Sequence, residues 1–137
     1  MRLLIISCLL LASGLAVLAR DVRVLIAPRT IAIPSSGQVI FDIYWVNDGE
    51  KVAIIPALER YTFFFSPVGP SDAEVGFQLR IVDHSGPDRK IAPRSIIHEN
   101  ATAEIGARGA NLVEVTAEFT GNRSRYKSNK VILRREP

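Results

Sequence analysis

Apolar and polar side chains alternate with a period of two along most of the chain, and no window keeps the spacing of an amphipathic helix. The cleanest example is LVEVTAEFT, where Val113, Val115, Ala117 and Phe119 fall on one side and polar residues on the other. Successive side chains of a strand point to opposite faces of a sheet. This segment therefore predicts a strand with one face buried.

Similar runs recur throughout the chain and are separated by glycine, proline, asparagine and aspartate, which is typical of short strands joined by turns. We expect an all-β fold, an antiparallel two-sheet sandwich of about seven to nine strands. RSIIHE and TAEI read as two separate short strands. The residues expected to share one core are Phe41, Ile43, Trp45, Phe77, Leu79, Ile81, Val113, Val115, Phe119, Val131 and Leu133.

The stretch YWVNDGEKVAIIP raises the choice between a turn and a cation site formed by Asn47, Asp48 and Glu50. Asp-Gly is a strong hairpin signal, because glycine accepts the positive φ of a tight turn. A two-residue tip at Asp48-Gly49 pairs Trp45 with Val52 and keeps the apolar residues on one face. Three side chains supply too few oxygen ligands for a cation. The pattern favours a hairpin turn.

The N-terminus resembles a secretory signal peptide: Arg2 is followed by an apolar run and small residues that end at Ala19. A transmembrane anchor is disfavoured by the polar and glycine residues within the run. A lipoprotein signal is disfavoured because almost no apolar sequence precedes Cys8. Cleavage after residue 19 of 137 leaves 118 residues, which suit one domain spanning 20–137. We expect a periplasmic or secreted protein.

Composition narrows the chemistry further. Cys8 and Met1 are the single cysteine and the single methionine, and both precede the expected cut. The mature chain then has no disulfide and no thiol, which fits a bacterial exported protein better than a small animal secreted domain. Its 16 basic and 14 acidic residues nearly balance. We expect no nucleic-acid partner.

Catalytic and cofactor motifs are weak. Asp83, His84 and Ser85 contain the three residue types of a serine triad, but neighbours in an extended chain point apart, and no nucleophile elbow accompanies them. With His98 as the second of only two histidines, ligands for zinc or copper are scarce. No phosphate-binding glycine loop is present. The expectation is a protein that is not an enzyme and has no metal or cofactor.

Two surfaces are candidates for binding. Phe64 in YTFFFS points away from its neighbours Phe63 and Phe65, and it is either covered by a loop or exposed on an edge strand that docks a partner. The second is a basic C-terminal run, either a solvated strand face or a site for anionic lipid, lipopolysaccharide or another polyanion. Its residues are Arg123, Arg125, Lys127, Lys130 and Arg134.

The loop SPVGPSDAE offers another binding mode. Its two prolines would stiffen the loop and lower the entropy lost on binding. A secreted protease-inhibitor-like protein that presents this loop is therefore an alternative, although no residue marks what would be inhibited.

VIFDIYWVNDGEKVAIIP and VEVTAEFT…YKSNKVIL give the order of segments a resemblance to bacterial secreted immunoglobulin-like β-sandwich domains. The resemblance implies an accessory or interaction module and carries no catalytic residues. Trp45 lacks the paired cysteines of antibody domains, so the resemblance concerns architecture. We expect an exported, non-catalytic module that docks an envelope or extracellular protein.

Overall fold

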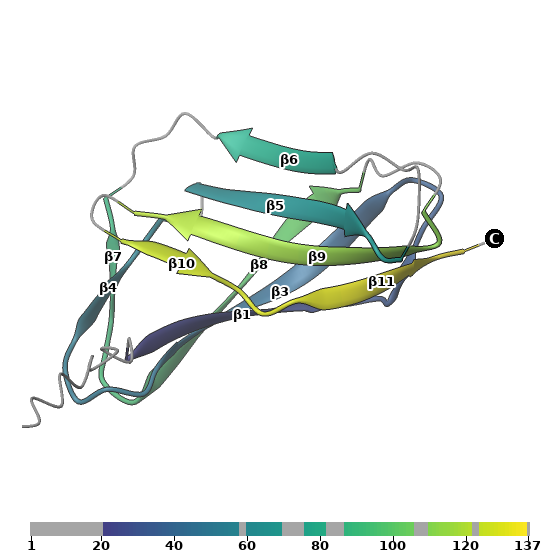
Figure 1. The fold of residues 1–137 in the computed structure, drawn as a ribbon. Helices are drawn as coiled ribbons and strands as arrows, with labels where there is room; N and C mark the ends of the chain where they lie inside the picture. The colour runs from purple at the N-terminus through teal and green to yellow at the C-terminus, as the bar shows by residue number, and fades with distance from the viewer. Residues whose placement is uncertain are drawn as a thin grey trace, which may run out of the picture.

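The computed structural model describes residues 21–57, 60–69, 76–81, 87–105, 110–121 and 124–136. The fold of these residues is all-β, with several sheets and no helix in the described ranges (Figure 1). The expected signal peptide, residues 1–19, lies outside them, and the boundaries of the expected domain stay a prediction.

The described residues form eleven strands. Their bounds are β1 Val22–Pro28, β2 Ala32–Ile33, β3 Gln38–Asn47, β4 Ala53–Ile55, β5 Arg60–Pro67, β6 Gly76–Ile81, β7 Arg89–Ile91, β8 Ser95–Glu104, β9 Leu112–Thr120, β10 Arg125–Lys127 and β11 Val131–Arg135.

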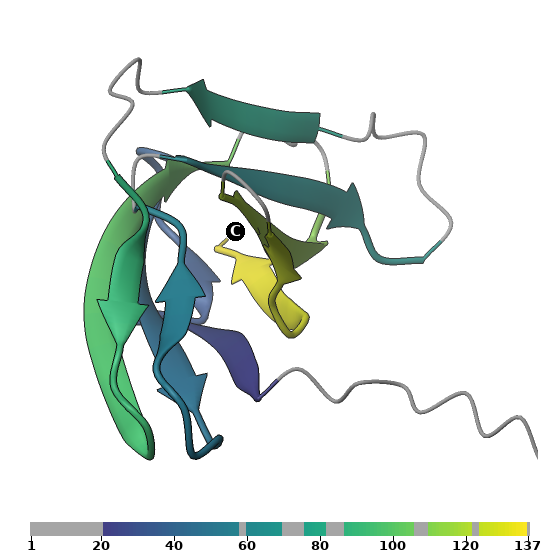
Figure 2. The ribbon, with the colours of Figure 1, turned by 90° about the vertical axis from the view of Figure 1, so that its left-hand side faces the viewer.

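The strands form three sheets. A three-stranded sheet has the order β1-β3-β8, a larger sheet has the order β2-β11-β9-β5-β6 with β10 also on β9, and β4 pairs with β7 alone. Figure 2 shows the three-stranded sheet and the larger sheet on opposite sides of the molecule. One apolar cluster draws its buried side chains from both sheets and from the β4–β7 ladder.

Alternation predicted the core faces of the central strands correctly. Phe41, Ile43 and Trp45 of β3 and the inward residues of β9 are fully buried, because the period of two in the sequence matches the pleat. Leu133 is buried, and Val131 packs partly buried against the same cluster. The side chains of Phe77, Leu79 and Ile81 lie outside the described part of the structure.

Three strand assignments differ from expectation. RSIIHE and TAEI belong to one continuous strand, β8, because its ten residues all pair with β3. The pairing is not wholly antiparallel, since β2 runs parallel to β11 through Ala32 and Ile33. The described strands outnumber the expected seven to nine, because two- and three-residue strands form and the C-terminal run divides into β10 and β11.

The predicted hairpin register between β3 and β4 is wrong. Both edges of β3 are occupied, by β1 on one side and β8 on the other. Trp45 therefore pairs with Val24 and Ile97 rather than with Val52. After the turn the chain leaves this sheet, and β4 pairs with β7.

The Asn47–Lys51 segment is a turn, as predicted, but its chemistry differs from that of an Asp-Gly tip. Asn47 is almost fully buried, and its side-chain oxygen accepts a hydrogen bond from the Gly49 amide at 3.0 Å. Its side-chain nitrogen lies 2.9 to 3.3 Å from the carbonyl oxygens of Lys51, Ile91 and Ala92. One buried amide thus ties the β3–β4 turn to the β7–β8 turn.

Glycine is required at residue 49 because another segment of the chain packs against it, and not because its backbone is left-handed. The positive-φ glycines among the described residues are Gly37 and Gly69. A Cβ at residue 49 would lie 2.6 Å from the Cβ of Asp21. The chain entering β1 therefore crosses directly over the turn, and the Asp48 amide donates to the Asp21 carbonyl at 2.8 Å.

Candidate functional site

The outer face of the three-stranded sheet is the face turned away from the core. Its side chains come from alternate residues of β1, β3 and β8. The register sets Leu25, Tyr44 and His98 in one row across the strands. The next row contains Asp42 and Asn100. We call this surface the outer face.

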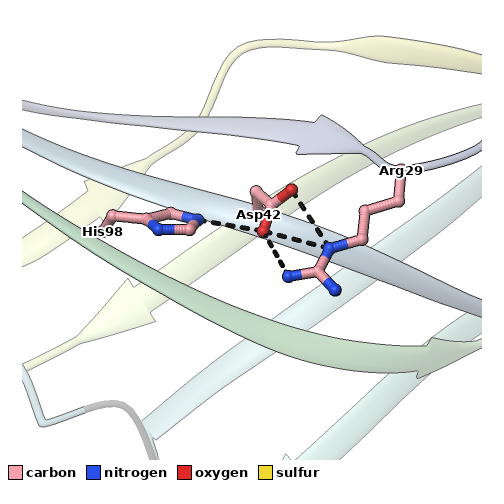
Figure 3. Close-up of polar contacts among 3 residues, drawn as sticks. All are labelled: Arg29, Asp42 and His98. Atoms are coloured by element: carbon pink, nitrogen blue, oxygen red, sulfur yellow. Dashed lines mark hydrogen bonds and ion pairs between the residues drawn. The ribbon is translucent and has the colours of Figure 1, made fainter.

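A polar cluster of Arg29, Asp42 and His98 lies at its centre (Figure 3). Asp42 is on β3, Arg29 follows β1, and His98 is on β8. The Arg29 guanidinium donates to the Asp42 carboxylate at 2.9 to 3.2 Å. The Nε2 atom of His98 lies 2.9 Å from Oδ1 of the same carboxylate. Residues from three neighbouring segments of the sheet therefore meet at one carboxylate.

The cluster keeps Asp42 ionised. Hydrogen bonds from Arg29 first, and then from His98, hold the pKa of the Asp42 carboxyl below its ordinary value of 3.8. The same contact raises the pKa of Arg29. A carboxylate can only accept hydrogen bonds, so Nε2 of His98 carries the proton. In a neutral imidazole the other nitrogen, Nδ1, is then an acceptor. Half of the His98 side chain is exposed to solvent.

Apolar side chains flank this polar centre. Tyr44 stacks on His98 with ring centroids 4.9 Å apart, which holds the imidazole against the sheet. Ile96 is 65% exposed, and Ile40 and Leu25 are about two fifths exposed. The outer face therefore combines a fixed polar cluster with exposed apolar side chains.

The sequence analysis did not place a site here. Alternation in QVIFDIYWV does put Asp42 and Tyr44 on the face opposite Trp45. Asp42 and His98, however, are 56 residues apart, and only the β3–β8 register brings them together. The spacing of residues within one segment cannot predict how β3 and β8 pair.

Phe64 does not lie on an edge strand. It is on β5, which is paired with β6 on one side and β9 on the other. Its side chain is 38% exposed. The edge-strand version of the Phe64 hypothesis is therefore wrong, because β5 has no free edge over its paired length. Docking on the ring itself stays a prediction.

Acidic neighbours on β9 pair with part of the basic C-terminal run. Arg125 pairs with Glu118 at 2.9 Å, and Lys130 pairs with Glu114 at 2.9 Å. The net charge of this face is therefore smaller than the basic run alone indicates. Arg123 lies outside the described residues.

Lys127 and Arg134 are also exposed. Arg134 borders an open hollow of about 380 Å³ beside β2, and a second hollow of about 250 Å³ adjoins Arg29. Both hollows share Ala32 and Glu136. Both are open to solvent rather than enclosed, and only the second, which Arg29 and Ile40 line, adjoins the outer face.

Other candidate chemistry falls largely outside the described ranges. Asp83, His84 and Ser85 are not described, and neither are residues 70–75 of the proline-containing loop. The described residues contain no group of three metal-ligating side chains close enough to hold an ion. Within the same ranges, no helix has the length and apolar character needed to span a bilayer.

Comparison with known proteins yields a fold neighbour and no family. No family model matches the chain, and no curated protein matches it. A solved structure that matches is Spo0M, the sporulation control protein of Bacillus subtilis, with a TM-score of 0.56 and 12% identity. The match covers 85% of this chain and 49% of the Spo0M chain, so this chain corresponds to about half of Spo0M. At that identity the likeness concerns the fold alone.

Proposed function

We propose that this protein is an exported, non-catalytic interaction module that docks an envelope or extracellular protein through the outer face. The observation that carries the proposal is the Arg29–Asp42–His98 cluster, which is fixed in geometry, accessible to solvent and flanked by Ile40 and Ile96. The shared core of two sheets also supports an immunoglobulin-like β-sandwich architecture.

The chemistry of the cluster suits recognition better than turnover. Asp42 is engaged by two neighbours, and His98 bonds to it through Nε2, which leaves Nδ1 on the other side of the ring from that contact. The preset geometry lowers the side-chain entropy lost on binding. A hydrolase would need a nucleophile beside the imidazole. Within the described ranges, His98 contacts the Asp42 carboxylate and the Tyr44 ring.

Anionic lipid is the less favoured partner for the C-terminal run, because Glu114 and Glu118 offset Lys130 and Arg125. Binding through unscreened surface cations falls as salt rises, since the Debye length shortens from about 10 Å at 0.1 M to about 3 Å at 1 M. Docking through the outer face should instead persist in high salt.

Capture from envelope extract, at low and high salt, tests the proposal. We expect wild-type protein to retain a specific protein that the double variant Ile96→Ser/His98→Ala loses. Phe64→Ser and Lys127→Glu, both on the other sheet, serve as matched controls and should retain it. Loss with either control, together with retention by the double variant, would reject the outer face.

Location is tested separately by the mass of the native protein. We expect a mature chain that begins at Arg20 in the periplasmic or culture fraction. An intact Met1 terminus in the cytosolic fraction would contradict the proposal of export.

A further inference from the structure

Strand β8 forms one edge of the three-stranded sheet. All ten of its residues pair with β3, and no strand within the described ranges adjoins its other side. The edge is long and regular, since the register runs from Ser95 to Glu104 without a bulge.

The hydrogen-bond pattern identifies which residues present their main chain at this edge. The Arg29 amide donates to Ile40 and the Asp48 amide to Asp21, so the even-numbered residues of β3 bond to β1. The Ile105 amide donates to Gly37, so odd-numbered residues connect β3 and β8. Bonding alternates along antiparallel strands. The outward N–H and C=O groups of β8 therefore belong to Ile96, His98, Asn100, Thr102 and Glu104.

Within the described ranges, a side chain caps the opposite edge of the same sheet, whereas no strand pairs with the outer side of β8. On β1 the outward groups of Ile26 are bound by the side-chain amide of Asn129 at 2.7 and 3.1 Å. Pro28 has no N–H to offer. Proline and charged side chains, lysine above all, are common devices that stop edge strands from pairing. Strand β8 has no proline, lysine or arginine; its two acidic residues are Glu99, which bonds to Trp45 and Arg89, and Glu104 at its end.

The charges of β8 favour self-association in one direction. Arg94 precedes the strand and Glu104 ends it. Antiparallel pairing centred on Asn100 uses all five outward residues. It sets Ile96 opposite Glu104, His98 opposite Thr102 and Asn100 opposite itself. It also brings the Arg94 end of one copy to the Glu104 end of the other, although each of these side chains already has a contact within its own chain, Arg94 with Glu50 at 3.2 Å. Parallel pairing would bring like ends together.

We propose that β8 pairs antiparallel with β8 of a second copy of this chain, with the twofold axis at Asn100. This joins two three-stranded sheets and their outer faces into one continuous surface. Two Arg29–Asp42–His98 clusters then lie on the same side of the dimer. The inference goes beyond the proposed function, since a monomer could dock a partner equally well.

The mass in solution tests the pairing, measured by light scattering across about 1 to 100 µM protein. Thr102→Pro removes an outward N–H without touching the bonds to β3, a substitution that edge strands tolerate. We expect wild type at twice the chain mass and Thr102→Pro at the single mass. Thr102→Ala keeps the amide and should stay dimeric. A monomeric wild type, or a dimer that survives in folded Thr102→Pro, would overturn the proposal.

A charge exchange at the twofold axis decides the register and does not depend on proline. Asn100→Lys alone and Asn100→Asp alone each place like charges opposite one another, and we expect monomers. A mixture of the two variants should recover the dimer mass. Dimers of either single variant, or no recovery in the mixture, would contradict pairing centred on Asn100. Docking of an envelope protein would be unaffected by that result.

Discussion

The side-chain amide of Asn129 forms a complete main-chain-like pair with Ile26: Oδ1 accepts from the Ile26 amide at 2.7 Å, and Nδ2 donates to its carbonyl at 3.1 Å. Asn129 lies between β10 and β11 in the larger sheet, whereas Ile26 is on β1. One residue thus joins the edges of two sheets. The adjacent Ser128 lies in the gap between β10 and β11. Its hydroxyl accepts a hydrogen bond from the Ala117 amide of β9 at 2.8 Å, in place of a main-chain bond between strands.

Asn129→Ala should lower the free energy of unfolding by about 1–3 kcal/mol, because it leaves both polar groups of Ile26 unpaired at a half-buried position. Urea unfolding followed by the fluorescence of the single tryptophan measures it. Lys130→Ala, which removes only an exposed ion pair, should cost at most about 1 kcal/mol. Equal effects of the two substitutions would contradict the linking role of Asn129.

Trp45→Ala should cost about 3–5 kcal/mol, mainly through the cavity it leaves. The ring is fully buried and lies edge-on to Phe119 and Tyr126. Trp45→Phe keeps most of this packing but loses the indole bond to Glu99 at 3.2 Å, and should cost less. A Trp45→Ala variant as stable as Trp45→Phe, judged by calorimetry, would show that the core does not depend on this ring.

Ionised Asp42 should make the folded protein more stable at neutral pH than in acid. Its folded pKa lies below the unfolded value near 3.8. The cluster's stabilisation is therefore fully present above that value and is lost as the pH falls through the lower, folded pKa. We expect the stability difference between wild type and Asp42→Asn to be present at neutral pH and to shrink in acid.

Urea midpoints at about pH 7 and about pH 2.5 measure this difference. Asp48→Asn is the matched control, because the pair of Asp48 with Arg23 is exposed on both sides. A difference between wild type and Asp42→Asn that is constant over this range would refute the role of the cluster.

Gly49→Ala should destabilise the fold by about 1–3 kcal/mol, because the added Cβ would meet Asp21 at 2.6 Å. Removing the opposing Cβ with Asp21→Gly should recover part of that loss in the double variant. A double-mutant cycle by chemical denaturation gives the coupling. Strictly additive effects would mean that the loss comes from the turn itself.

Sequence pattern predicted which faces of β3 and β9 are buried, because the period of two is a local property of each strand. It could not predict which strands become neighbours. Asp48-Gly49 favoured a hairpin, yet the local signal contains no information that β1 and β8 take both edges of β3. Asn47 then became the centre of the turn by bonding to β7, which is 44 residues away at Ile91.

The candidate site was missed for the same reason. Arg29, Asp42 and His98 are ordinary polar residues: Arg29 follows β1, Asp42 is on β3 and His98 is on β8. Their meeting depends on two registers, one that brings together residues 13 apart and one that brings together residues 56 apart. The basic run, by contrast, was visible in the sequence, but its pairing with Glu114 and Glu118 required the β9 register.

The affinity of the captured protein for outer-face variants tests the central claim most directly. We expect the dissociation constant to rise at least about tenfold for Ile96→Ser/His98→Ala, or about 1.4 kcal/mol, while Phe64→Ser binds as wild type. The opposite result, wild-type affinity in the outer-face variant and weakened binding in Phe64→Ser, would place the docking surface on the other sheet and contradict the account.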